Sequence, residues 1–179
     1  ICFARQGHAS VLAHSELRER AVAVSSFGKT YHMTGWKIGY VLGAADLMTE
    51  FRKVHQFNVF TVNTPCQLGL AEYLRDPARY LGLAAFYQHK RDFFREQLRG
   101  SRFELLPCRG TYFQLARYSA ISDLPDHEFV KWLTIEKGVT AIPLSPFYEI
   151  PPAGQRLVRL CFAKNDATLD AAIERLRAL

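Results

Sequence analysis

The sequence has few cysteines, no internal repeat and no long hydrophobic run, and each of these features narrows the class of protein. Its four cysteines lie far apart in a chain of 179 residues, without a C-x-x-C pair or a matching pair of histidines. This spacing favours reduced thiols over a metal site or a disulfide framework. No apolar stretch approaches the roughly 20 residues that span a bilayer. We therefore expect a soluble, cytoplasmic protein with no metal and no membrane partner.

The basic charge of the chain has no pattern that indicates nucleic-acid binding. The net charge is +6, but Lys and Arg are spread along the sequence and gather only in dipeptides such as Arg52-Lys53 and Lys90-Arg91. We expect a solvated basic surface and no nucleic-acid partner. With 49% hydrophobic and 13% aromatic residues, the chain can bury a core. It starts at Ile1 and soon enters the loop-like stretch RQGHAS, so we expect further residues upstream.

The first part of the chain has the pattern of an α/β domain. The apolar run AVAV, residues 21–24, lacks alternation, which is typical of a strand covered on both faces in a parallel sheet. Around it we expect a short helix capped by Ser15, a second strand over residues 36–42, an amphipathic helix from Asp46, and a helix with Thr64 as cap and Pro65 in its first turn.

The second part changes to a small α+β pattern after one long helix. Apolar residues recur at helical spacing over residues 78–98, which predicts a connecting helix between two packed units. We then expect strands over residues 103–106, 111–118, 139–144 and 157–163, a helix over residues 126–137 stopped by Gly138, and a final helix capped by Asn165 or Asp166.

One short segment, SSFGKTYHMTGWKIGY (residues 25–40), places chemistry-bearing residues between the first two strands. Lys29 follows small residues in a turn, where a ligand can approach closely and burial would lower the lysine pKa enough for attack on a carbonyl. Ser26 adds a hydroxyl, and Lys37 adds a cation suited to a phosphate. The residues alone equally allow an ordinary lysine at a strand end, with its stem buried and its amine in water.

This segment resembles the lysine motif of the class I, fold-type-I aminotransferases that depend on pyridoxal 5'-phosphate. That motif has a serine three residues before the lysine, a cation eight residues after it, and glycines flanking the cation. The resemblance implies that Lys29 binds the cofactor covalently and that Ser26 and Lys37 contact its phosphate. Many members carry arginine at the second cation, whereas the methionine and kynurenine aminotransferase subgroup commonly has lysine there.

Later segments resemble the same family in order and spacing over essentially the whole chain. They are HQFNVFTVNTPCQLGLAEYL, PCRGTYF and RLVRLCFAKNDATLDAAIERL. The resemblance implies that Arg159 grips the substrate carboxylate, a role suited to a planar guanidinium fixed on a strand. From the residue alone, Arg159 equally suits a surface ion pair on an edge strand.

The resemblance also implies the substrates and the assembly. Phe60 and Thr61 fall where family members reach a neighbouring subunit's pocket, which predicts a homodimer acting on an L-amino acid, methionine or aromatic, and a 2-oxo acid. Ordinary packing at a helix end is the alternative for both residues. Weaker pocket candidates, for which core packing or loop anchoring is favoured, are Tyr31, His32, Tyr112 and Phe147.

The expected fold is therefore the end of a fold-type-I large domain, a mostly parallel sheet with helices, followed by a small α+β domain. Residues 1–76 are expected to belong to the large cofactor-binding domain, and residues 77–179 to an interdomain helix and the small domain. The family's residues for the cofactor ring would lie upstream, so the chain alone is expected to carry half of a site. Three alternatives stay open: a β-lyase for sulfur amino acids, the effector domain of a transcription regulator, and an inactive truncated product.

Overall fold

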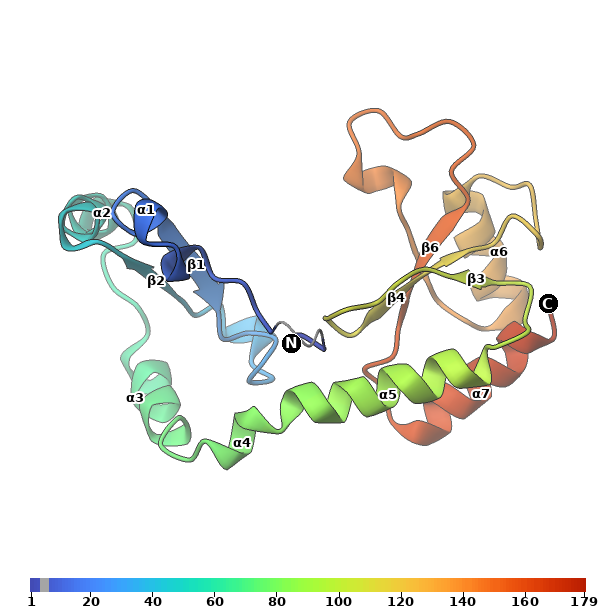
Figure 1. The fold of residues 1–179 in the computed structure, drawn as a ribbon, viewed down its shortest axis with the longest axis horizontal. Coiled ribbons are helices and arrows are strands. Elements are labelled where there is room, and N and C mark those ends of the chain that lie inside the picture. The colour runs from blue at the N-terminus through green and yellow to red at the C-terminus, as the bar shows by residue number, and fades with distance from the viewer. Residues whose placement is uncertain (4–6) are drawn as a thin grey trace. The chain divides into compact units, whose positions relative to one another are not determined.

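The computed structural model of the chain describes residues 1–3 and 7–179, which divide into two compact units. One unit spans residues 7–83, and the other combines residues 84–179 with Ile1–Phe3. Figure 1 shows the elements of each. Among the described residues, no helix is long and apolar enough to cross a membrane.

The first unit is built on a β-hairpin with helices before and after it. Its elements are η1 (Val11–Ala13), α1 (Ser15–Arg18), β1 (Val22–Ser26), η2 (Thr34–Trp36), β2 (Gly39–Gly43), α2 (Ala45–Asn58), α3 (Thr64–Tyr73) and α4 (Ala78–Leu81). The small core of this unit consists of Ile38, Cys66 and Leu70, packed against Phe27, Tyr31, Met33 and Val62.

Strand β1 differs from the buried parallel strand that its apolar run predicts. It pairs antiparallel with β2, from Val22 opposite Gly43 to Ser26 opposite Gly39. Val22 is 48% exposed and Val24 is 76% exposed. The intervening segment returns as a hairpin loop, and strands joined in this way pair antiparallel. Every strand pair among the described residues is antiparallel.

Two helix starts differ from their predicted caps. The N-cap of α3 is Asn63, whose side-chain oxygen accepts from the Cys66 N–H at 3.0 Å, while Thr64 is already helical. Asn at an N-cap is at least as favourable as Thr, which explains the shift by one residue. The N-cap of α1 is His14, and Ser15 is its first helical residue.

The second unit is a four-stranded antiparallel sheet packed against helices. Its elements are α5 (Leu83–Gln97), β3 (Glu104–Leu105), β4 (Phe113–Arg117), α6 (Asp126–Lys137), β5 (Ile142–Pro143), η3 (Ser145–Phe147), β6 (Leu157–Cys161) and α7 (Asp166–Arg177), with the strand order β3-β4-β6-β5. Gly138 ends α6 in the left-handed conformation with a φ of 64°, as predicted. Asn165 caps α7, accepting from the Thr168 N–H at 2.8 Å.

Helices α5 and α7 lie side by side and run in the same direction (Figure 1). Lys90 reaches Asp166 at 2.8 Å at one end, and Arg177 donates to the Gln97 carbonyl at 3.2 Å at the other. The main core of this unit draws on α5, α6, α7 and the sheet, and it includes Phe94, Phe129, Leu133, Val158, Phe162, Leu169 and Ile173. The sheet that carries β6 is therefore fixed by a continuous apolar core.

Candidate functional site

The hairpin loop between β1 and β2 brings together three of the predicted site residues. Ser26 is the last residue of β1, and the pairing continues one step further because the Phe27 N–H donates to the Ile38 carbonyl at 3.0 Å. Lys37 lies directly beside Ile38, and Lys29 lies at the start of the loop. The loop therefore holds a hydroxyl and two ammonium groups on one rigid scaffold.

Gly28 is the fixed point of this loop. Its carbonyl accepts from the Met33 N–H at 2.9 Å and from the Thr34 hydroxyl at 3.0 Å, and its own N–H donates to the Ser26 hydroxyl oxygen at 3.0 Å. A Cβ at Gly28 would lie 3.1 Å from the Ser26 oxygen and 3.2 Å from the Thr34 Cα. Gly28 is buried, and this close packing leaves little room for a Cβ, so the position favours glycine.

The two loop lysines are exposed in the described chain. Lys37 adopts a φ of 54°, in the left-handed region that non-glycine residues rarely occupy, and its neighbour Ile38 is buried. Such backbone strain is retained where the surrounding structure over-determines the residue, and it clusters at functional sites. Lys29 is exposed as well. The described residues therefore do not supply the burial expected around Lys29.

Tyr31 lies in a cluster of aromatic rings beside the loop. Its ring centroid is 5.8 Å from that of Tyr73 and 5.9 Å from that of Tyr80, both near edge-to-face. Burial raises the pKa of Tyr31, and the neighbouring phenols raise it further. These contacts favour the packing role of Tyr31 over a ligand role. His32 is exposed and has a φ of 53°.

Phe60 and Thr61 follow α2 as exposed residues. Phe60 has a φ of 70° and an exposed fraction of 80%, and its N–H donates to the His55 carbonyl at 3.0 Å. A large side chain in this conformation is an outlier, because glycine is preferred where a helix ends in the left-handed region. The Thr61 hydroxyl donates to the Val62 carbonyl at 3.4 Å.

Arg159 occupies an inner strand of the second unit. Its strand β6 is flanked by β4 and β5, with Arg159 opposite Leu115 on one side and Ile142 on the other. The alternative of an edge-strand arginine is therefore wrong. The guanidinium carbon lies 4.2 Å from the Phe113 ring centroid and 5.4 Å from that of Phe147. Arg159 thus lies against two aromatic rings, an arrangement that stabilises a cation.

The Arg159 Nε is buried and has no hydrogen-bond partner among the described residues. A buried donor without a partner costs free energy, and such groups are rare in native structures. A carboxylate accepts from Nε and a terminal nitrogen of the same guanidinium at once. The donor set of Arg159 therefore fits a carboxylate ligand.

Tyr112 and Phe113 border the same guanidinium. Burial raises the pKa of Tyr112, as do Cys161 and Tyr87, whereas the positive charge of Arg159 opposes this shift. Phe113 is a contact that the sequence reasoning missed. Its signal is the strand register: Phe113 pairs with Cys161, two residues beyond Arg159, so both side chains occupy one face of the sheet.

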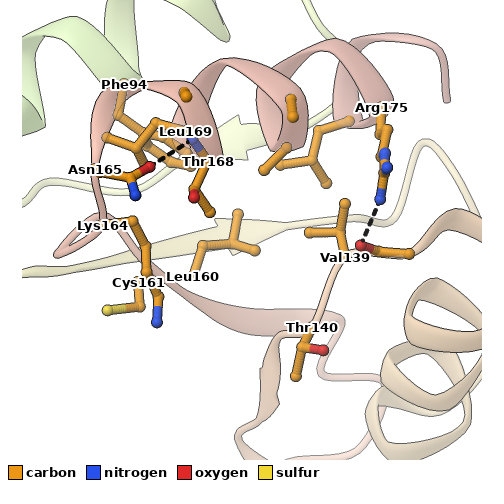
Figure 2. A pocket seen from close by; sticks show the side chains of 15 residues that line it. Phe94, Val139, Thr140, Leu160, Cys161, Lys164, Asn165, Thr168, Leu169 and Arg175 are labelled. Carbon is orange, nitrogen blue, oxygen red and sulfur yellow. Dashed lines mark hydrogen bonds between the residues drawn. The ribbon is translucent and has the colours of Figure 1, made fainter.

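A cavity of about 520 Å³ lies beneath α7, and no sequence-predicted site residue lines it. Figure 2 shows its polar rim, where Asn165 accepts from Thr168 and the Arg175 guanidinium donates to the Gly138 carbonyl at 2.9 Å. Leu160 and Val139 form part of its apolar wall (Figure 2). The Asn165 side-chain oxygen and the Arg175 guanidinium thus bond to protein partners, which indicates a structural role for these two groups.

The chain belongs to the class I and II aminotransferases, whose family model matches residues 2–176. This family is dependent on pyridoxal phosphate. Among individual proteins, the chain is 61% identical to the methionine aminotransferase of Escherichia coli K12, over 100% of this chain and 46% of that protein. It is 35% identical to human kynurenine–oxoglutarate transaminase 1, over 95% of this chain and 45% of that protein.

Solved structures confirm the α/β fold class and the predicted family. A structure of E. coli YbdL, described as having a methionine aminotransferase function, superposes with a TM-score of 0.95 at 61% identity, over 100% of this chain and 47% of that one. N-succinyldiaminopimelate aminotransferase from Mycobacterium tuberculosis gives 0.89 at 31% identity, over 99% and 47% of the two chains. The chain thus spans about half the length of the relatives it matches.

Proposed function

We propose that this chain acts as the second half of an aminotransferase that moves the amino group of an L-amino acid, methionine or aromatic, to a 2-oxo acid. The observation that carries the proposal is the hairpin loop with Ser26, Lys29 and Lys37 in a member of a pyridoxal-phosphate-dependent family. The 61% identity of this chain to a methionine aminotransferase supports methionine as the amino-group donor.

The residues of the loop fit the cofactor. Ser26 keeps its hydroxyl hydrogen for a phosphate oxygen, because its oxygen is the acceptor in the bond with Gly28. Lys37 supplies a point charge to the same phosphate, and Lys29 supplies the amine that binds the cofactor carbonyl covalently. When bound, pyridoxal phosphate supplies a ring that accepts the electrons released at the substrate α-carbon.

Two residues of this chain then act on the substrate. Arg159 binds the substrate carboxylate through its unpartnered Nε and a terminal nitrogen, which fixes the orientation of the α-carbon. The amine of Lys29, once free of the cofactor, takes the α-proton and later returns it, acting as base and acid in turn. The exposure of Lys29 in the described chain is consistent with its needing the rest of the protein for burial.

The proposal extends to assembly and domain organisation. Residues 1–76 belong in this proposal to the large cofactor-binding domain, and residues 77–179 form the interdomain helix and small domain. Phe60 is 80% exposed and Thr61 is exposed too, which suits side chains that complete the pocket of a second subunit in a homodimer. The whole protein acts in the cytoplasm in this proposal.

The test uses the full-length protein that carries this chain. Borohydride reduction in the presence of pyridoxal phosphate, followed by peptide mass analysis, is expected to add one cofactor to the peptide containing Lys29. Lys29→Ala is expected to lose both the adduct and methionine transamination, because in this proposal the Lys29 amine supplies both the covalent link and the proton transfer. The matched control is Lys53→Ala, which removes an exposed lysine paired with Glu50 on α2. Substantial transamination by Lys29→Ala would contradict the proposal.

A further inference from the structure

A buried carboxylate ties α6 to the turn that carries Phe147. Asp126, the first residue of α6, is only 5% exposed. Its carboxylate accepts from the Leu144 N–H at 2.7 Å, the Ser145 N–H at 2.6 Å and the Ser145 hydroxyl at 2.7 Å. These bonds join segments 18 and 19 residues apart, so they fix tertiary structure in addition to the helix start.

The carboxylate of Asp126 is held in its charged form. Burial raises the pKa of Asp126, but the hydrogen bonds from the backbone and hydroxyl of Ser145 and from the Leu144 backbone outweigh burial and lower the pKa. Bonds from neutral donors to a charged acceptor are stronger than those between neutral groups. The tether is therefore a strong one for a surface turn.

The tethered turn determines where the Phe147 backbone lies. Leu144 and Ser145 begin η3, and within this turn the Phe147 N–H donates to the Leu144 carbonyl at 3.0 Å. Pro146 fixes one backbone dihedral between the tether and Phe147. Only Pro146 thus separates the anchored Ser145 from Phe147, so the backbone there has little freedom.

Apart from its backbone, few interactions hold the Phe147 side chain in position. Its exposed fraction is 61%, yet its ring centroid lies 5.4 Å from the Arg159 guanidinium carbon. A ring this exposed gains little from apolar burial. By contrast, Phe113, the other aromatic ring that contacts Arg159, belongs to the paired strand β4. The position of Phe147 therefore depends on its backbone, and the backbone depends on Asp126.

We propose that Asp126 is a positioning residue for the carboxylate site at Arg159: by anchoring Leu144 and Ser145, it holds the Phe147 ring against the guanidinium. This inference rests on the proposed function of Arg159. A fixed ring orients the guanidinium and excludes water beside it, and both effects strengthen its bond to a carboxylate. Without the tether, Phe147 moves away and Arg159 binds the substrate carboxylate less well.

The kinetic test compares variants of the full-length protein. Asp126→Ala is expected to raise the KM for methionine about 5-fold, within the range of a cation–π contact, with kcat changed less than about 2-fold. Methioninol, which lacks the carboxylate, should inhibit the variant and the wild type equally. Ser145→Ala removes one of the three bonds and should give a smaller rise. Glu128→Gln changes an exposed carboxylate in the same helical turn and should have no effect.

A second measurement does not depend on activity. Chymotrypsin cleavage after Phe147, followed by mass spectrometry, reports how freely the turn opens, and it should be several-fold faster in Asp126→Ala than in Glu128→Gln. Absent transamination in the wild type would contradict the proposed function, while the cleavage rates would still test the tether. Unchanged cleavage would overturn the inference, and so would faster cleavage with an unchanged KM. If Asp126→Ala does not fold, Ser145→Ala decides by the same two readouts.

Discussion

Arg159 and Phe113 are diagonal neighbours on one face of the sheet, with the guanidinium carbon 4.2 Å from the ring centroid. The register creates this contact, because Leu115 pairs with Arg159 and Phe113 pairs with Cys161. A guanidinium spread over a ring keeps its edge nitrogens free for a planar acceptor. The Phe113 ring thus covers one face of the Arg159 guanidinium, while the edge of the guanidinium stays available for hydrogen bonds.

Replacing Arg159 by lysine should therefore be costly even though the charge is kept. Lysine is a point charge that cannot bind a carboxylate at two points or spread over the Phe113 ring. We expect Arg159→Lys in the full-length protein to raise the KM for methionine roughly 10- to 100-fold, as for loss of a hydrogen bond between charged groups. Steady-state kinetics with methionine as donor provide the measurement.

The control for this variant is Arg156→Lys. Arg156 precedes β6 and donates to the Gln155 carbonyl at 3.4 Å, so it tests the effect of an arginine change in the same segment. Its KM for methionine should stay within about 2-fold of the wild type. An equal rise in both variants would show that the segment tolerates no change, and it would remove the argument for a specific carboxylate contact at Arg159.

Local signals in the sequence predict most helices and strands of the second unit. The main difference between prediction and structure is one shortened strand, and a hydrogen bond to Asp126 explains it. Helix α6 has its predicted bounds because Gly138 can adopt a positive φ. The strand predicted over residues 139–144 pairs only over Ile142–Pro143. Pro143 has no N–H, and the N–H of Leu144 donates to Asp126 instead of a neighbouring strand. A pattern of apolar residues does not reveal that competing acceptor.

Intrinsic propensity also explains why the long helix predicted over residues 78–98 is divided. Helix α4 ends at Leu81 with Gly82 as its C-cap, and α5 begins at Leu83. Glycine costs about 1 kcal/mol relative to alanine inside a helix, so it is a natural break point. The apolar spacing on both sides is helical, which is why periodicity alone did not locate the interruption.

The candidate site could be predicted in part from the sequence. The lysine motif indicated Ser26, Lys29 and Lys37, and the hairpin brings these residues into one loop. The aromatic contacts of Arg159 depend on strand register and on the turn before β6, neither of which has a local signature. The left-handed backbone at Lys37 was equally invisible, because nothing in a lysine side chain predicts a positive φ.

We expect Phe60 to lower the folding stability of the protein while contributing to its catalytic efficiency. Its φ of 70° disfavours any residue with a Cβ. Its ring is 80% exposed, so apolar burial of the ring contributes little to stability. We expect Phe60→Gly to raise the free energy of unfolding by up to about 1 kcal/mol, because relief of the left-handed strain exceeds the entropic cost of glycine. Urea denaturation of the full-length protein measures this change. The same variant should lose catalytic efficiency for methionine if Phe60 contributes to a pocket.

Phe57 offers the matched control three residues earlier. It is 87% exposed and lies within α2, so glycine there removes a similar ring from a helical position. Phe57→Gly should lower the free energy of unfolding by roughly 0.5–1 kcal/mol, opposite in sign to Phe60→Gly. Destabilisation by both variants would mean that the Phe60 backbone is not strained in the way its φ indicates.

Tyr118 should make the second unit sensitive to alkaline pH. Its side chain is fully buried, donates to the Leu124 carbonyl at 2.9 Å and stacks on Phe129 at 3.8 Å between ring centroids. Burial raises the pKa of Tyr118 from 10.0 to about 12. The folded state therefore keeps a proton that the unfolded chain loses above pH 10. Stability from this group is complete below pH 10 and is lost as the pH rises toward 12.

The expected loss of unfolding free energy from Tyr118 is about 1.4 kcal/mol between pH 9 and pH 11. Tyr118→Phe should be about 1 kcal/mol less stable at pH 8, since the Leu124 carbonyl loses its donor, but its stability should fall less steeply above pH 10. Tyr148→Phe, at a residue that is 44% exposed, should follow the wild-type slope. Urea denaturation at pH 8, 9, 10 and 11 separates these outcomes. Parallel slopes for the wild type and Tyr118→Phe would mean that the Tyr118 phenol ionises as readily in the folded chain as in the unfolded one.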